Sequence, residues 1–229
     1  MFDLAATPDG ALWLRTREGL SRFDGKSFQS IPRIPRIDKN PLSTKTEALA
    51  VDRQGRVWTV DDRGLWRVEG TNAVEITAVG RNASQNALHV GPDGALWFQD
   101  TVTGNGRIAR YDGERLDRVS SKESMIRRYV TAIHATPEGI LWLGDTGGGV
   151  TRFDPVRFSF ARMGGGKDPP EEEVTKVRPG PDGALWFSTR SGLYRYEEGP
   201  FALPISREEL LGLLEGELQR CLEGVEAAG

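Results

Sequence analysis

The chain is short of cysteine, of long apolar runs and of charge of one sign, and each shortage excludes a class of protein. Its one cysteine, Cys221, cannot form an internal disulfide or supply a thiolate cluster for a metal ion. No apolar run approaches the ~18 residues of a membrane-spanning helix. The formal net charge of −3 leaves no basic excess of the kind found in nucleic-acid-binding proteins. We therefore expect no membrane span and no nucleic-acid partner.

The start of the sequence, Met1–Leu4, lacks the basic and apolar stretches of an export signal. We expect a cytoplasmic protein if Met1 is the native start, and a periplasmic one if the sequence is an excerpt of a larger sensor. Of the 229 residues, 38% are hydrophobic and 28% are charged. This is the composition of a soluble, folded domain with a sizeable core.

One short motif recurs five times, and its fullest copy is GPDGALWF at Gly91–Phe98. Its tryptophan returns at intervals of 45, 39, 45 and 44 residues, and a glycine stands three residues before each one. Proline followed by an acid and by glycine, which accepts positive φ, predicts a tight turn between two strands. Further along, each copy carries an aliphatic residue, a variable residue, an arginine, an aromatic residue or valine, and an acid. The tryptophans are Trp13, Trp58, Trp97, Trp142 and Trp186, and the arginines are Arg22, Arg67, Arg110, Arg152 and Arg195.

A near-constant period of this length is typical of a propeller blade made of four antiparallel strands. The tryptophan has apolar neighbours on its strand, as in Leu96-Trp97-Phe98, which indicates a strand covered on both faces. We predict an all-β fold, a β-propeller of five four-stranded blades over residues 1–204. We expect a ring closed by side-by-side packing of the first and last blades, and the alternative is an excerpt of a larger propeller. The predicted blades span about 2–31, 47–79, 87–119, 130–163 and 174–203.

Residues 205–229 differ from the repeats and predict a short amphipathic C-terminal helix. Ser206 and Glu209 have the spacing of a capping box. One helical stripe is apolar, although three glycines weaken the helix and call for a surface that supports it. Three roles stay open: a cap on the propeller, a dimerisation helix, or the start of a signalling linker. The stripe consists of Leu210, Leu214, Leu218, Cys221, Leu222 and Val225.

The repeat pattern reads as a strand, then Asp-x-x-Gly-x-(Leu/Val)-Trp, then Gly-Leu-x-Arg-Phe-Asp-Gly, and Val130–Gly144 gives its best copy. All five repeats thereby resemble the two-component regulator propeller family. The resemblance implies a propeller, and in that family such propellers usually form ligand-sensing regions ahead of a transmembrane helix and a kinase. GPDGALWF, followed by Gly106-Arg107-Ile108, also resembles repeats of streptogramin B lyases, which are metal-dependent propeller enzymes. No catalytic or metal-binding residue is carried over from either family.

A residue that is present in every repeat is expected to have a structural role in the blade, because a single functional site does not need five copies of the same residue. The five tryptophans are therefore predicted to be core residues, and the five arginines to be structural. We expect each arginine to pair with an acid or a carbonyl near the turn between the second and third strands, because a buried guanidinium needs such partners. Candidate partners are Asp61, Asp100 and Asp145.

Residues that differ between the repeats point to function, and the innermost strand of each blade borders the central channel. Eight residues before the tryptophan, the repeats carry Ala5, Ala50, His89, His134 and Arg178 in turn, and Lys176 lies two residues before the last of these. We predict a polar patch at the channel that binds an anion or another small ligand, made by His89, His134, Lys176 and Arg178. The alternatives are wall groups without a ligand, or an acid–base or metal site. No third metal ligand stands at matching spacing, so we assign no catalytic residue, no metal and no cofactor.

The connections between second and third strands, and those between blades, are expected on one face and vary in length. Variable loops on a rigid scaffold are where binding usually occurs, and a mixed-charge rim suits a protein or peptide partner. The sequence thus favours a non-enzymatic recognition or sensor module that binds a protein, a peptide or a small ligand through this face and the channel mouth. The alternatives are a metal-dependent lyase or hydrolase acting at the channel mouth through His89 and His134, and a structural or oligomerisation scaffold. The predicted partner-binding loop residues are Arg36, Lys39, Arg127, Arg128 and Lys167.

Overall fold

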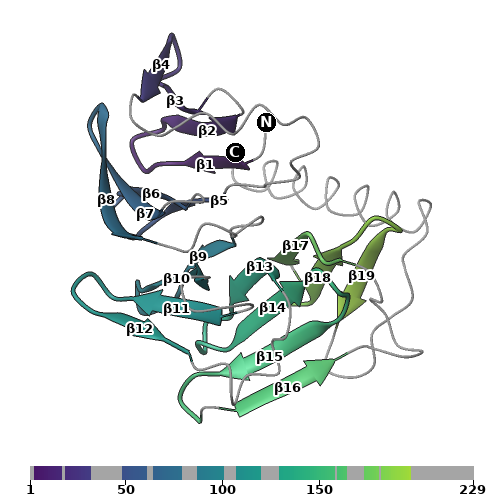
Figure 1. The fold of residues 1–229 in the computed structure, drawn as a ribbon. Helices are drawn as coiled ribbons and strands as arrows, with labels where there is room; N and C mark the ends of the chain where they lie inside the picture. The colour runs from purple at the N-terminus through teal and green to yellow at the C-terminus, as the bar shows by residue number, and fades with distance from the viewer. Residues whose placement is uncertain are drawn as a thin grey trace, which may run out of the picture.

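The structure is a computed structural model that describes most of the repeat region of the chain (Figure 1). The described residues are 3–16, 19–31, 48–60, 64–78, 87–100, 107–119, 129–157, 159–163, 173–180 and 182–196. Several predictions concern residues outside these ranges: the helix at 205–229, the last strand of the fifth blade near 201–203, and the five loop residues Arg36, Lys39, Arg127, Arg128 and Lys167.

The described residues form five antiparallel sheets, each made of strands that follow one another in the chain. Blade one is β1 (Asp3–Ala6), β2 (Leu12–Thr16), β3 (Gly19–Phe23) and β4 (Phe28–Ile31). Blade two is β5 (Ala48–Val51), β6 (Val57–Val60), β7 (Gly64–Glu69) and β8 (Asn72–Ala78). Blade three is β9 (Leu88–Val90), β10 (Leu96–Asp100), β11 (Arg107–Tyr111) and β12 (Leu116–Arg118). Blade four is β13 (Val130–Ala135), β14 (Leu141–Asp145), β15 (Val150–Asp154) and β16 (Ser159–Met163), and blade five is β17 (Lys176–Pro179), β18 (Leu185–Ser188) and β19 (Leu193–Tyr196).

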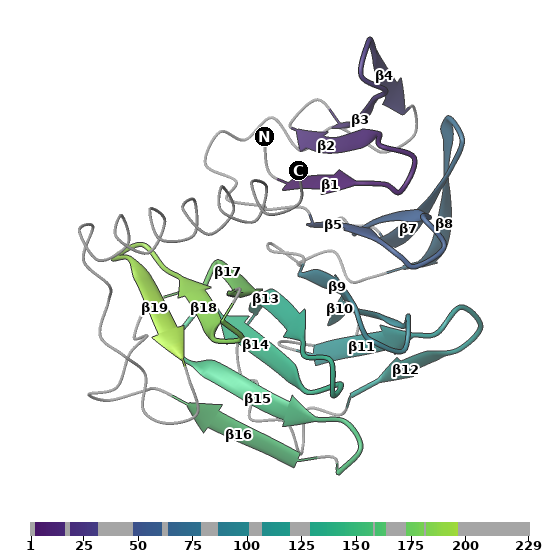
Figure 2. The same cartoon turned by 180° about the vertical axis from the view of Figure 1, so that it is seen from behind.

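The five sheets are arranged around a common axis, with the first strand of each blade nearest the centre (Figures 1 and 2). The predicted all-β propeller of five blades is therefore confirmed. In the described residues, blades one to four have four strands each and blade five has three. Within the same residues, no helix is long and apolar enough to cross a membrane.

The first turn of every blade is built on the repeated glycine. Gly10, Gly55, Gly94, Gly139 and Gly183 all have φ between 76° and 85°. An L side chain rarely adopts this conformation, so glycine is the residue that closes the turn without strain. In each case the glycine N–H donates to the carbonyl three residues earlier, as Gly94 does to Gly91 at 2.9 Å. The turn that the sequence predicts between the first and second strands is thus formed in all five repeats.

The repeated tryptophan sits near the start of the second strand and packs between blades. Four of the five are buried: Trp13, Trp58, Trp97 and Trp142 are 2–6% exposed. Trp97 makes an edge-to-face contact with Phe153 of the next blade, with ring centroids 6.2 Å apart. The prediction that the tryptophans are core residues holds for these four, and Trp186 of blade five is half-buried.

Consecutive blades pack through one repeated interface. The tryptophan-bearing face of one blade meets the aliphatic face of the next, and an apolar cluster fills each of four junctions, from blade one–two to blade four–five. Because both faces of the middle blades are covered, every residue of their second strands is buried, and the residues next to the tryptophan are apolar, as in Leu141-Trp142-Leu143. Members of the first cluster show the pattern: Trp13 and Leu20 from blade one against Leu49, Val57 and Trp66 from blade two.

Three of the five repeated arginines pair with an acid at a different turn from the one expected, and a fourth, Arg67, pairs with Glu69 of its own strand. In three blades the partner is the aspartate of the first turn, in the pairs Arg22–Asp9 (2.9 Å), Arg110–Asp93 (2.6 Å) and Arg195–Asp182 (2.7 Å). The reason is register: Arg110 lies directly opposite Trp97, the second residue of its strand, so its side chain is beside the turn that precedes that strand. These guanidinium groups are partly exposed rather than buried.

The acids that the sequence singled out as arginine partners have other roles. Asp100 pairs with Arg118 on the outer strand of its own blade. Asp145 accepts a hydrogen bond from the Gly147 N–H at 2.8 Å. Asp61 lies outside the described residues. The expectation that these acids pair with the repeated arginines is therefore wrong for Asp100, whose ion pair is with Arg118.

Candidate functional site

A cavity of about 600 Å³ lies on the axis of the propeller, where the innermost strands of the five blades converge. Residues from β1, β5, β9, β13 and β17 all line it. This volume is in the range of pockets that hold small organic ligands. The cavity is therefore where the sequence places the channel, and the four predicted ligand-binding residues, His89, His134, Lys176 and Arg178, are all in its lining.

His89 and His134 occupy equivalent positions in neighbouring blades. Each lies opposite the tryptophan of its own sheet, His89 opposite Trp97 and His134 opposite Trp142. The centroids of the two imidazole rings are 5.0 Å apart and the rings meet edge to face. The structure thus brings the only two histidines of the sequence together on one wall of the cavity.

Both histidines are held neutral at physiological pH. Burial disfavours the charged form and lowers the pKa of each imidazole to about 4, and the positive charge of Arg178 acts in the same direction on both. Repulsion from His134 adds to the lowering for His89, whereas a hydrogen bond with the Ala135 backbone opposes it. A neutral imidazole donates one hydrogen bond and accepts another, so His89, whose N–H is used by the Ala135 backbone, offers a ligand an acceptor, while His134 can offer a donor.

Arg178 supplies the positive charge of the site. It lies opposite Trp186 in blade five, so it continues the series of His89 and His134 by one blade. Its side chain is exposed, and its Nη1 donates to the carbonyl of Val177 at 3.0 Å. A guanidinium has five N–H donors in a fixed fork, so it can bind a carboxylate through two of them.

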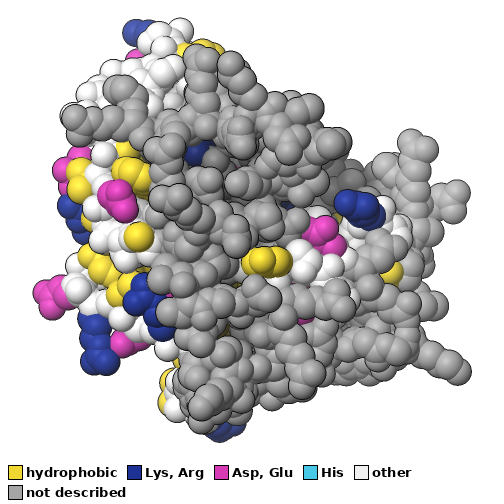
Figure 3. All heavy atoms as spheres, in the orientation of Figure 1, with side chains coloured by type: hydrophobic (Ala, Val, Ile, Leu, Met, Phe, Trp, Pro, Cys, Tyr) yellow, Lys and Arg dark blue, Asp and Glu magenta, His cyan; other side chains and the backbone are white. Residues whose placement is uncertain are grey.

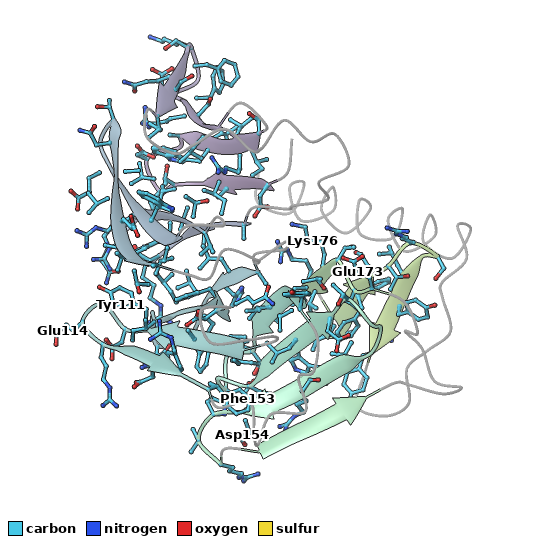
Figure 4. The ribbon with its side chains drawn as sticks, in the orientation of Figure 1. Tyr111, Glu114, Phe153, Asp154, Glu173 and Lys176 are labelled. Atoms are coloured by element: carbon cyan, nitrogen blue, oxygen red, sulfur yellow. The ribbon has the colours of Figure 1, made fainter. Side chains whose placement is uncertain are left out.

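Lys176 forms an ion pair inside the protein, so its charge is not free to bind a ligand as expected from the sequence. Its Nζ lies 3.5 Å from the Asp3 carboxylate, which belongs to blade one. The same carboxylate accepts a hydrogen bond from the Leu49 N–H at 2.9 Å and so also holds blade two. Figure 4 labels Lys176 and Glu173 where β17 begins, beside the central cavity. Lys176 therefore joins the ends of the propeller at the cavity wall.

Part of the cavity lining is aliphatic. Ala50 and Val51 of blade two and Val90 of blade three belong to it, and Ala50 occupies the position that His89, His134 and Arg178 have in blades three to five. A ligand in the cavity can thus contact small aliphatic side chains as well as imidazole and guanidinium groups. This mixed lining favours a small molecule with an apolar body and a polar or acidic end.

Sequence reasoning missed part of the lining. Asp3, Glu173, Thr175 and Arg190 contribute to the cavity without having been proposed as site residues. For Asp3 a signal was present: the first and last repeats carry opposite charges at one position, Asp3 and Lys176, and these two blades are neighbours in a ring. For Thr175 a signal was also present, because Thr131 stands at the same repeat position in blade four and lines the cavity too. Glu173 and Arg190 come from segments between strands, where the repeats share no pattern. In the described residues, no group of three or more His, Cys, Asp or Glu side chains is placed to hold a metal ion.

Comparisons with known proteins define the fold and leave the family open. No protein-family description matches the sequence, and no curated protein sequence matches it. Among solved structures, virginiamycin B lyase from Staphylococcus aureus is similar with a TM-score of 0.67 and 16% identity, over 90% of this chain and 70% of that one. The extracellular domain of a protein described as a hybrid two-component system of B. thetaiotaomicron is similar with a TM-score of 0.66 and 15% identity. That match covers 86% of this chain and 26% of the other.

A third similar structure is PorZ, a bacterial surface component of the type-IX secretion system of Porphyromonas gingivalis. It has a TM-score of 0.61 and 17% identity, over 90% of this chain and 34% of that one. All three likenesses are low in sequence identity and therefore establish the propeller fold alone. Both groups of proteins that the repeats resemble, sensor propellers and streptogramin B lyases, are among the similar structures.

Proposed function

We propose that this protein is a non-enzymatic recognition module that binds a small organic acid in its central cavity. One observation supports the proposal most strongly: two neutral histidines, with ring centroids 5.0 Å apart, line a cavity of about 600 Å³ together with Arg178 and several aliphatic side chains. The fold repeats the same framework five times, and these side chains are where the copies differ. Differences at one position of an otherwise repeated scaffold favour a role in recognition rather than in packing.

The chemistry of the lining supports an acidic ligand. Arg178 offers paired N–H donors to a carboxylate, and neutral His134 can donate one further hydrogen bond, whereas the one N–H of neutral His89 is already used by the Ala135 backbone. The carboxylate would meet its counter-charge inside a partly desolvated cavity, where charge-assisted hydrogen bonds are stronger than in water. The aliphatic body of the ligand would contact Ala50, Val51 and Val90. Asp3 does not oppose this, because its carboxylate is already paired with Lys176.

Thermal denaturation with a panel of small acids tests the proposal. The panel consists of hexanoate, benzoate and phenylacetate, each compared with its neutral amide. At ~10 times its dissociation constant a ligand stabilises a protein by about 1.4 kcal/mol, which raises the Tm of a domain of this size by about 3–6 °C. We expect at least one acid to produce such a rise, and its amide to produce little.

Two matched variants test whether the rise in Tm comes from binding in the cavity. Arg178→Gln removes the charge beside the histidines, and we expect it to weaken acid binding at least tenfold, because a hydrogen bond to a charged group contributes about 1.5–3 kcal/mol. Arg157→Gln makes the same change at an exposed arginine in the turn before β16, and we expect it to leave the shift intact. A rise that survives Arg178→Gln, or the absence of a rise with every acid, would refute the proposal.

The second candidate function is a metal-dependent lyase or hydrolase at the same cavity, favoured by the adjacent histidines and by the fold shared with virginiamycin B lyase. Two imidazoles alone are one ligand short of a catalytic zinc site, which has three protein ligands. We therefore expect no stoichiometric uptake of Zn²⁺ or Co²⁺ at micromolar concentration. Uptake that is lost in the His89→Ala/His134→Ala double variant would favour the enzyme over the recognition module.

We place this module in a sensor that faces the cell exterior or periplasm. Support comes from the extracellular two-component-system domains among the similar structures, in which a propeller of this kind forms part of a much longer chain. Binding of a protein or peptide at the variable loops, including Arg36, Lys39, Arg127, Arg128 and Lys167, belongs to the same proposal. Substituting these five residues with serine would abolish partner capture and leave acid binding in the cavity unchanged.

A further inference from the structure

The face of blade one that points away from blade two is apolar and open. Leu4, Leu12 and Phe28 are 48%, 37% and 67% exposed. The strand register places Leu12, Phe23 and Phe28 in one row across the sheet, and Phe23 and Phe28 stack with ring centroids 4.6 Å apart. Figure 3 shows hydrophobic side chains at the surface over this blade, at the top of the view. The equivalents of Leu4 and Leu12 in the other blades are no more than 8% exposed: Leu49, Leu88, Ile133 and Val177 for Leu4, and Val57, Leu96, Leu141 and Leu185 for Leu12.

Blade five has the complementary open face. Trp186 and Leu193 are half-buried there, whereas the other four repeat tryptophans and the residues equivalent to Leu193 are buried. The blades follow one another around the axis in chain order, so blade five comes next to blade one (Figures 1 and 2). In a repeated interface, the face with Trp186 is the one that would meet the face with Leu12. Among the described residues, no apolar cluster joins these two faces, and an ion pair between Lys176 and Asp3 connects blade five with blade one.

We propose that residues 205–229 dock between these two faces and cover them, so that the tail completes the fifth junction. The sequence predicts an amphipathic helix there, with a single apolar stripe that includes Leu214, Leu218 and Leu222. Twenty helical residues extend ~30 Å, enough to cross a four-stranded sheet, which is ~19 Å wide. The chain reaches the junction directly, because β19, the last described strand, belongs to blade five and 33 residues follow Tyr196.

Charge favours the same occupant. The tail carries six glutamates and two arginines, which leaves four negative charges between residues 205 and 229. The open face of blade five carries Arg178 on the same side as Trp186, while Lys176 and Arg195 on that side are paired with Asp3 and Asp182. The apolar stripe of the tail therefore matches the open apolar rows, and its acidic flanks match the positive charge of Arg178 on blade five. A partner blade or a second copy of the chain would have to displace this segment.

Disulfide trapping with the single native cysteine tests this docking in the full chain. Cys221 lies in the apolar stripe, so Leu4→Cys, Leu12→Cys and Phe28→Cys each introduce one possible partner on the blade-one face. Val156→Cys is the control, because Val156 is 91% exposed in a turn of blade four. After mild oxidation we expect most molecules of at least one blade-one variant to hold an intramolecular disulfide, and the Val156→Cys variant to keep two free thiols. Disulfides formed only between chains would overturn the proposal in favour of a second copy.

A second measurement does not depend on the alignment of two thiols. In the Cys221→Ser background, the Leu12→Cys thiol is labelled with iodoacetamide, with and without Leu214→Lys and Leu218→Lys in the tail. If the tail covers blade one, these lysines will raise the labelling rate at least tenfold, and they will leave the rate at Val156→Cys unchanged. Equal rates with and without the lysines would overturn the proposal, whatever the outcome of the acid-binding experiments.

Discussion

Trp97→Ala should bring the protein close to unfolding at room temperature. Trp97 is 5% exposed and packs in the cluster that joins blades three and four, against Phe153. Truncating a buried tryptophan costs about 3–5 kcal/mol, because its transfer free energy is lost and a cavity remains. A typical domain has a total stability of about 5–15 kcal/mol, so this single change removes a large part of it. Urea denaturation followed by far-UV circular dichroism measures the loss.

Two further variants make the tryptophan result specific. Trp97→Phe keeps an aromatic ring between Ile108 and Phe153, so we expect it to lose clearly less stability than Trp97→Ala. Val156→Ala changes a side chain that is 91% exposed, and we expect a change within ~0.5 kcal/mol. If Trp97→Ala were no more destabilising than Val156→Ala, the packing of blades through their tryptophans would be wrong.

The protein should lose stability steeply between pH 6.5 and 4, before most carboxylates titrate. His89 and His134 have a pKa of about 4 in the folded protein, lowered by burial and by nearby positive charge from an ordinary 6.5. In this window the unfolded chain binds more protons than the folded one, so stability is complete above pH 6.5 and falls as the pH falls through 4. At pH 5 the loss is roughly 2 kcal/mol per histidine, since one pKa unit corresponds to ~1.4 kcal/mol.

A double variant isolates the histidine contribution. His89→Gln/His134→Gln removes both titrating groups, so the free energy of unfolding should become nearly flat between pH 6.5 and 4, whatever its absolute value. The loss below pH 4 should remain, because it comes from carboxylates such as Asp9, whose pKa is lowered to about 2 by hydrogen bonds from Thr7, Ala11 and Arg22. A wild-type curve that is already flat between pH 6.5 and 4 would show that the two imidazoles are not buried in the folded state.

Most of the fold could be predicted from the period of the sequence repeats. Five tryptophans at nearly constant spacing, each with a glycine three residues before it, define the strand pairs and turns that the structure contains, because a blade repeats its packing and its turn chemistry together. The acids that pair with the repeated arginines could not be predicted from the sequence in the same way. Whether Arg110 reaches Asp93 or Asp100 depends on the strand register, which puts Arg110 opposite Trp97 at the first-turn end of the sheet. A one-dimensional pattern does not contain that pairing.

The candidate site was predictable where the repeats differ and hidden where they share no pattern. His89, His134 and Arg178 stand at one repeat position, so alignment of the copies placed them on one wall, and all three line the cavity. The ring distance of 5.0 Å and the lowered pKa values follow from blade spacing and burial, which only coordinates provide. Thr175 could have been found in the same way, because Thr131 stands at its repeat position in blade four and lines the cavity too. Glu173 and Arg190 come from connecting segments where the repeats share no pattern, so comparison of the repeats does not indicate them.

Nitrogen-15 NMR of the imidazoles tests the central claim most directly, because the sequence has only two histidines and both line the cavity. The spectra are recorded from pH 7 to 4, without ligand and with hexanoate, benzoate or phenylacetate at millimolar concentration. We predict that an acid which binds shifts the signals of both rings and raises the pKa of each above its ligand-free value of about 4, because a bound carboxylate stabilises the imidazolium form. Imidazole signals and pKa values that are identical with and without every acid would contradict recognition of an acid in the central cavity.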